Sequence, residues 1–148
     1  MPIPPLTTDG TLPPGVHEST LEETRARFGA FQESDRRPRL FERFAELFAE
    51  VERSGRFSAI VVDGSFVTAK SAPEDIDVII ALRADHDWTA DLNPSDYALV
   101  SRTALRRRFR FDVLLANDGG EDYARYVEFF SRVRDHAAAR KGMLRINL

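Results

Sequence analysis

The chain has 148 residues, of which 43% are hydrophobic and 30% charged, and its formal net charge is −3. These values are ordinary for a globular domain and argue against a chain that coats nucleic acid through bulk positive charge. The absence of cysteine excludes disulfides and thiolate metal sites. No apolar run is long enough to span a membrane and no leader pattern opens the chain, so we expect a cytoplasmic protein without membrane contact, with one domain over residues 1–148.

The first third of the chain predicts an extended segment and two helices. Residues 1–16 hold five of the eight prolines, so we expect this segment to be extended and to lie on the surface. Residues 19–30 predict a short helix capped by Ser19. An amphipathic helix is then predicted to begin near Pro38 and to end at Gly55. Its apolar residues recur at helical spacing and are Leu40, Phe41, Phe44, Leu47, Phe48 and Val51.

Strands and helices alternate in the rest of the chain. The patterns predict, in order, a strand at 57–62, a Gly64-Ser65 turn with a short helical piece to residue 69, a strand at 76–82, a helix from Asn93 to about Arg107, a strand at 109–115, a helix from Tyr123 that ends at Gly142, and an edge strand at 143–147. This order predicts an α/β or α+β fold with a small mixed β-sheet flanked by helices.

Two aspartates stand in the Ile/Val-rich run that follows the Gly-Ser turn. Strands disfavour aspartate, and residues two apart share a face of a strand, so we expect Asp75 and Asp77 to point the same way about 7 Å apart. Two unpaired carboxylates this close repel each other unless a cation lies between them. Asp112 lies opposite the apolar face of the next strand and can join the pair if the two strands are neighbours. Such a trio suits two Mg²⁺ ions acting in a displacement at phosphorus, with Asp112 helping to deprotonate the incoming hydroxyl.

The Gly64-Ser65 pair predicts a phosphate site beside these carboxylates. Glycine lets the backbone approach a phosphate closely, and free N–H groups at the start of the following helical piece favour an anion. Ser65 adds a hydroxyl donor, and Lys70 adds a positive charge that can contact a triphosphate. A basic cluster at residues 102–110 can serve a polyanionic substrate, although such clusters at helix ends are more often solvated surface.

The order Gly64-Ser65, Asp75-Ile76-Asp77 and Asp112 resembles the signature of the polymerase-β-like nucleotidyltransferase superfamily in its minimal form. More closely, the segment Gly-Ser-Phe-Val-Thr-x-Lys-x-x-Pro-x-Asp-Ile-Asp is similar to that of a bacterial subgroup of small nucleotidyltransferase-like proteins. Residues 12–17 and 141–146 also look like that subgroup, so the resemblance covers most of the chain.

The resemblance implies a nucleotidyltransferase-like fold and a role for each matching residue. Asp75 and Asp77 would bind two Mg²⁺ or Mn²⁺ ions, Asp112 would complete the metal site, and Gly64 and Ser65 would hold ATP or another NTP. The implied reaction transfers a nucleoside monophosphate from the NTP to a hydroxyl and releases pyrophosphate. The acceptor would be a tRNA or a protein, because the chain is too short for a separate acceptor-binding domain; minimal relatives often work beside a toxin or antitoxin partner.

Two other hypotheses stay open. The chain can be a catalytically degenerate nucleotidyltransferase-fold binding module that acts as an antitoxin or regulatory subunit. Its small size, its basic cluster and Thr68-Ala69-Lys70, where many minimal members carry a glycine, favour this hypothesis. Alternatively, the chain is a plain α/β domain whose aspartates only form ion pairs with Arg108 or Arg110.

Overall fold

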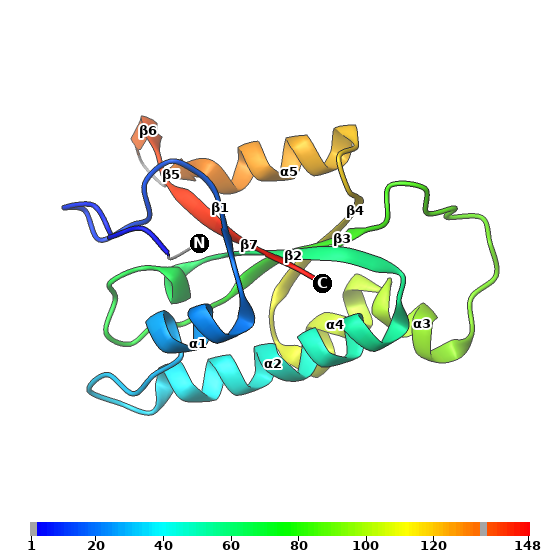
Figure 1. Ribbon diagram of the computed structural model, residues 1–148, viewed down its shortest axis with the longest axis horizontal. Helices are drawn as coiled ribbons and strands as arrows, with labels where there is room; N and C mark the ends of the chain where they lie inside the picture. The colour runs from blue at the N-terminus through cyan, green and yellow to red at the C-terminus, as the bar shows by residue number, and fades with distance from the viewer. Residues whose placement is uncertain (1–2, 134–135) are drawn as a thin grey trace.

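A five-stranded mixed sheet forms the centre of the computed structural model, which describes residues 3–133 and 136–148 (Figure 1). The strands lie in the order β1 (Gly15–Ser19), β7 (Gly142–Asn147), β2 (Phe57–Asp63), β3 (Asp77–Leu82) and β4 (Asp112–Asn117). β2 runs antiparallel to both of its neighbours, whereas β1 is parallel to β7 and β4 is parallel to β3. The predicted α/β class with a small mixed sheet is therefore confirmed.

Helices cover both faces of this sheet (Figure 1). One face carries α1 (Leu21–Phe28), α2 (Arg36–Ser54), α3 (Pro94–Leu99) and α4 (Arg102–Phe109), and the other carries α5 (Glu121–Ser131). A 3-10 turn, η1 (Ser65–Val67), follows β2, and a small antiparallel pair, β5 (Arg132–Val133) and β6 (His136–Arg140), follows α5. Within the described residues, no helix combines the length and the apolar character needed to cross a membrane.

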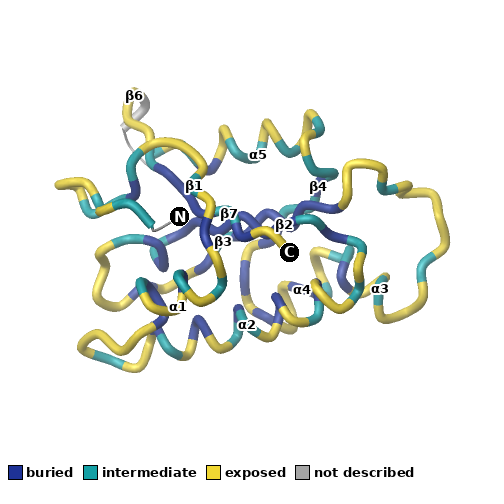
Figure 2. The backbone as a smooth tube through the Cα atoms, in the orientation of Figure 1, coloured by how far each residue is buried: buried dark blue, intermediate teal, exposed yellow. Residues whose placement is uncertain are grey.

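Side-chain alternation along the strands divides the apolar residues between two cores. The larger core packs residues such as Ile60, Val62 and Ile80 against α2, whose buried face is the predicted apolar stripe. The smaller core lies under α5 and consists of Val61, Ile79, Phe130 and Met143 with partly buried neighbours. Figure 2 shows that the central strands are buried and that exposed residues lie mainly in loops and on the outer sides of the helices.

The N-terminal part of the chain differs from its prediction in two ways. The segment before Gly15 is free of helix in its described part, as expected, but Leu12 is buried and the segment leads into β1 at the edge of the sheet. The predicted cap was one residue early, because Ser19 is the last residue of β1. Thr20 caps α1 instead, and its hydroxyl accepts a hydrogen bond from Glu23 N over 3.1 Å.

Three predictions for the second half were wrong. The single helix from Asn93 to Arg107 is two helices, because the hydroxyl of Ser101 accepts from Ala104 N and starts a new helix. The helix predicted to end at Gly142 ends at Ser131, before β5. The strand predicted at an edge is β7, which lies inside the sheet between β1 and β2.

The start of β7 packs tightly against the N-terminal segment. Gly142 N donates to Leu12 O over 2.9 Å. A Cβ atom added to Gly142 would lie 1.9 Å from Pro13 O, so only glycine fits at this position. This contact brings together two segments from opposite ends of the sequence. It lies next to Lys141, the residue that precedes Gly142.

Candidate functional site

Four charged side chains gather at one end of the sheet, on the face covered by α5. β2 ends at Asp63, and the strand pairing places it opposite Asp77, the first residue of β3. Asp77 is also the register partner of Asp112, the first residue of β4. Lys141 immediately precedes β7. Alternation puts these side chains on the same face as Val61 and Ile79 of the smaller core. The strands of Asp77 and Asp112 are neighbours, which is the condition under which Asp112 was expected to join the pair.

These residues line a cavity of about 620 Å³, which lies within the usual size range of small-molecule sites. Its wall combines carboxylates, cations and apolar side chains. The lining residues are Asp63, Asp75, Asp77 and Asp112; Arg102, Arg132 and Lys141; and Val113, Leu114, Phe129, Phe130 and Val133. The cavity can therefore accept a ligand that carries both charge and an apolar part.

Asp77 experiences the strongest electrostatic effect in this cavity. Burial raises its pKa, and the negative charges of Asp75, Asp63 and Asp112 raise it further, while Lys141 opposes them. The result is a pKa of about 7, compared with an ordinary value of 3.8. A carboxylate that holds its proton near neutral pH marks a region of negative potential, and perturbed groups of this kind are common at functional sites.

Asp63 and Lys141 form a nearly buried ion pair in the same cavity. The Lys141 ammonium donates to both carboxylate oxygens of Asp63, over 2.8 and 2.7 Å. The Asp63 side chain is 4% exposed and that of Lys141 is 20% exposed. Burial raises the pKa of Asp63, although Lys141 acts in the opposite direction. Lys141 therefore supplies a positive charge beside the four carboxylates.

Asp75 lies before β3, and therefore outside the strand whose face it was expected to share with Asp77. Its Oδ1 accepts hydrogen bonds from Ser65 N over 2.9 Å and from Ser65 Oγ over 2.6 Å. Although burial acts to raise the pKa of Asp75, these two bonds together with the positive charges of Lys141 and Lys70 outweigh it and lower the pKa. Gly64 has φ +91°, and an added Cβ would lie 3.0 Å from Asp77 N. The Gly-Ser turn thus packs against the Asp-x-Asp segment, and the Ser65 hydroxyl is bonded to a carboxylate.

The two remaining predicted residues have partners at the surface. Asp112 pairs with Arg106 over 3.3 Å, and both side chains are well exposed. Lys70 lies 3.9 Å from Glu74 and is absent from the lining of the cavity, as is Gly64.

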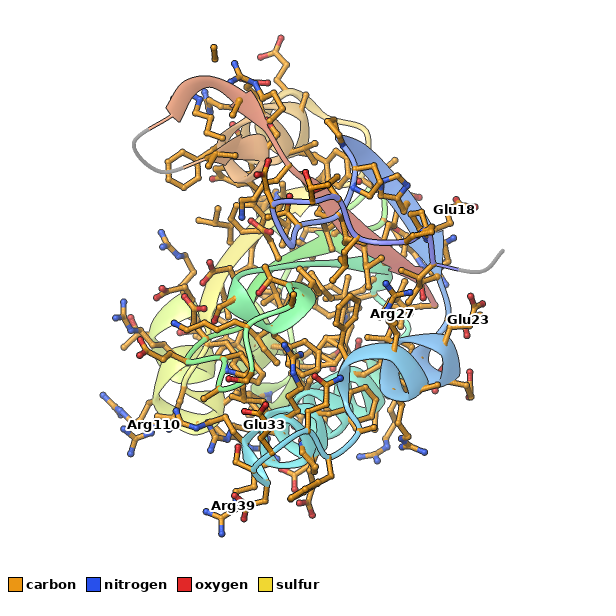
Figure 3. All side chains as sticks on the ribbon, turned by 90° about the vertical axis from the view of Figure 1, so that its left-hand side faces the viewer. Glu18, Glu23, Arg27, Glu33, Arg39 and Arg110 are labelled. Atoms are coloured by element: carbon orange, nitrogen blue, oxygen red, sulfur yellow. The ribbon has the colours of Figure 1, made fainter. Side chains whose placement is uncertain are left out.

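Arg108 and Arg110, which were expected to form ion pairs with the aspartates, do not contact them in the structure. Arg108 pairs with Glu50 over 2.6 Å. Arg110 lies at the outer surface (Figure 3). The plain ion-pair hypothesis is therefore wrong about the arginines that it named, because Arg108 pairs with Glu50 of α2 and neither arginine lines the cavity.

The donor chemistry of the cavity suits Mg²⁺, because carboxylate oxygens are its preferred protein ligands. Asp75, Asp77 and Asp112 are the residues that would hold it, and the repulsion that raises the pKa of Asp77 is what a divalent cation would relieve. Across residues 3–133 and 136–148, however, no three His, Asp or Glu side chains are arranged so that they could hold a metal ion. Side chains at this end of the sheet would have to rearrange to bind one.

Several cavity residues were missed as site residues from the sequence. Asp63 directly precedes the Gly-Ser pair, so its place at a strand end was a usable signal. Lys141 is one of only two lysines and begins the last apolar run, but nothing local connects it with Asp63, which is 78 residues away. Phe129 lines the cavity and is 61% exposed, whereas its neighbour Phe130 is buried.

The fold and the cavity define an α/β protein with a carboxylate-rich pocket at the joined ends of β2, β3 and β4. The chain matches the model of a family of unknown function (DUF6932) over residues 4–147, and it therefore belongs to that family. Neither the curated proteins nor the solved structures contain a significant match.

Proposed function

We propose that this protein is a Mg²⁺-dependent nucleotidyltransferase that moves a nucleoside monophosphate from an NTP to a hydroxyl of an RNA or protein acceptor. The observation that carries the proposal is the convergence of Asp63, Asp75, Asp77 and Asp112 on one cavity that also holds cations and an exposed aromatic ring. This combination matches the parts of a nucleotide, which are an anionic triphosphate and a flat base. The resemblance of the Gly64-to-Asp112 pattern to minimal nucleotidyltransferases supports the same assignment.

In the proposed reaction, the acceptor oxygen bonds to the α-phosphorus while the bond from that phosphorus to the bridging oxygen breaks. Pyrophosphate leaves, and the proton of the acceptor hydroxyl passes to Asp112, whose side chain is 63% exposed. Asp75, Asp77 and Asp112 would hold Mg²⁺, which would supply positive charge at the transferred phosphoryl group. Arg102 and Arg132 line the cavity and would face the triphosphate, and the ring of Phe129 would pack against the base.

The test is incubation of the purified protein with α-phosphate-labelled NTPs, Mg²⁺ or Mn²⁺, and total cell RNA and protein. We expect a labelled acceptor, and we expect the Asp75→Asn, Asp77→Asn double variant to lose at least about 100-fold in labelling, since charge stabilisation of the transferred group is lost. The matched control is Asp85→Asn, Asp91→Asn, which changes the charge equally at two exposed loop positions. Full labelling by the double variant at Asp75 and Asp77 would overturn the proposal.

A second candidate function is a catalytically degenerate binding module. It is favoured by the hydrogen bonds and ion pairs that already engage Asp63, Asp75 and Asp112. Such a module would bind a partner protein as an antitoxin or regulatory subunit. A stable complex that is insensitive to Mg²⁺ and NTP, together with no labelling and no NTP binding by calorimetry, would support this candidate over the enzyme.

A further inference from the structure

Lys141 places a positive charge among the four carboxylates of the cavity. Its ammonium contacts both oxygens of Asp63 at 2.8 and 2.7 Å. Asp63 is in turn the register partner of Asp77 across β2 and β3, and both side chains line the same cavity. A positive charge is therefore already present in the space between the strand ends that a divalent cation would use.

The other two cations of the cavity are engaged elsewhere. Arg102 Nε donates to the carbonyl oxygen of Val113 over 2.7 Å. Arg132 Nε lies 3.6 Å from Glu128, on α5. Lys141 differs from both because its contact is with a carboxylate of the cavity itself.

The attachment of Lys141 leaves its ammonium able to move. The backbone of Lys141 is held, since its N–H donates to Ser131 O over 2.8 Å and the next residue is locked against Pro13. The side chain is a flexible four-carbon stem that ends in a compact charge; it is 20% exposed and lines the cavity. The ammonium can exchange one anionic partner for another without a change in the fold.

We propose that Lys141 is an exchangeable counter-ion, which holds the cation position of the carboxylate cluster and must leave Asp63 before a divalent cation binds to Asp75, Asp77 and Asp112. This inference rests on the proposed function. Once released, the ammonium contacts the phosphates of the bound nucleotide, which supply the next anionic oxygens in the cavity. The exchange couples the two ligands, because the metal frees the group that then holds the triphosphate.

The test is a titration of the protein with Mn²⁺ alone, in which binding is measured by calorimetry and by electron paramagnetic resonance. The Lys141→Met variant lacks the positive charge that competes with the metal. We therefore expect it to bind Mn²⁺ at least about tenfold more tightly than the wild type does. The matched control is Arg39→Met, which also removes one positive charge, at a side chain that is 73% exposed and lies outside the cavity lining. We expect it to change the affinity by less than about threefold.

A second comparison covers the case in which Lys141→Met leaves the buried Asp63 carboxylate unpaired and unfolds the protein. Asp63→Asn, Lys141→Met removes both charges, and it is compared with Asp63→Asn alone. We again expect tighter Mn²⁺ binding when the lysine is absent. Equal or weaker binding in the folded lysine-free variants overturns the proposal.

The outcomes separate this inference from the proposed enzyme. Tighter Mn²⁺ binding by the lysine-free variants, with no nucleotide transfer by the wild type, supports the exchange and removes the transferase. Unchanged Mn²⁺ affinity in a protein whose wild type labels an acceptor removes the exchange and keeps the transferase. No Mn²⁺ binding by any of these proteins overturns both.

Discussion

Asp77 is the residue at which the electrostatics of the site are concentrated. It lies in the middle of three strand ends, paired in register with Asp63 on one side and Asp112 on the other. Burial and three neighbouring carboxylates keep its pKa near 7. The folded protein therefore holds a proton on Asp77 at pH values where the unfolded chain has released it.

This difference predicts a specific effect of pH on stability. Between about pH 4 and pH 7 the folded state binds more protons than the unfolded state, so the contribution of Asp77 to the free energy of unfolding falls as the pH rises through that window. We expect Asp77→Asn to be more stable than the wild type above pH 7, by an amount on the order of 1 kcal/mol after solvent screening, and equal to it near pH 4. Urea unfolding at pH 4, 5.5, 7 and 8, without divalent metal, measures the difference. Parallel curves for the two proteins across this range would contradict the assignment.

At the scale of elements, one buried arginine connects α2 with the Gly-Ser turn. The Arg37 side chain is 1% exposed, and burial lowers its pKa. Its guanidinium donates to four backbone carbonyls, those of Phe28, Phe66, Thr68 and Lys70. Three of these acceptors belong to the segment that follows Ser65, so the position of the predicted phosphate turn depends on α2.

Replacement of Arg37 by lysine should therefore be costly. A single ammonium cannot reproduce the planar fork that serves these carbonyls, and each buried carbonyl left without a donor costs about 1–3 kcal/mol. We expect Arg37→Lys to lower the free energy of unfolding by about 2–3 kcal/mol, as measured by urea denaturation. The control is Arg39→Lys, because the Arg39 side chain is 73% exposed and pairs with Asp35. Its expected effect is within about 0.5 kcal/mol, and a similar small value for Arg37→Lys would show that the turn does not depend on this contact.

At the scale of the whole molecule, β7 joins the two ends of the chain to the centre of the sheet. It pairs with β1 on one side and with β2 on the other. The tight contact between Gly142 and Pro13 fixes the N-terminal segment against this strand. Lys141 directly precedes this contact, so the pairing of β7 in the sheet also places the Lys141 side chain at the cavity.

Gly142→Ala tests this arrangement. Since the new Cβ would meet the backbone carbonyl of Pro13, one of the two segments must shift, and overpacking of this kind costs about 1–3 kcal/mol. The free energy of unfolding measures the loss. Val16→Ala, at a 37% exposed position of β1, is the control and should cost less than about 1 kcal/mol. An equal effect of the two changes would show that the approach of Pro13 to Gly142 is not needed for stability.

The sequence by itself determined the features that depend on near neighbours. The periodicity of α2, its end at Gly55, the two central strands and the α/β class follow from contacts within a few residues. The Asp-x-Asp segment and Asp112 also identified one end of the sheet, because strand alternation is a local property.

The tertiary structure alone decided which segments meet. The burial of Asp63 and its pairing with Lys141 join positions 78 residues apart, and no local pattern encodes that contact. The interior position of β7 was missed for the same reason. A short apolar strand has the same sequence pattern at the edge of a sheet as inside it, so its position depends on its partners. The Ser65 hydroxyl, expected to be available to phosphate, bonds to Asp75 because the fold brings the two within 2.6 Å. Local sequence patterns thus determined the helices, the strands and the position of the carboxylates along the chain. The long-range pairing of strands decided which cations and hydrogen-bond donors contact those carboxylates.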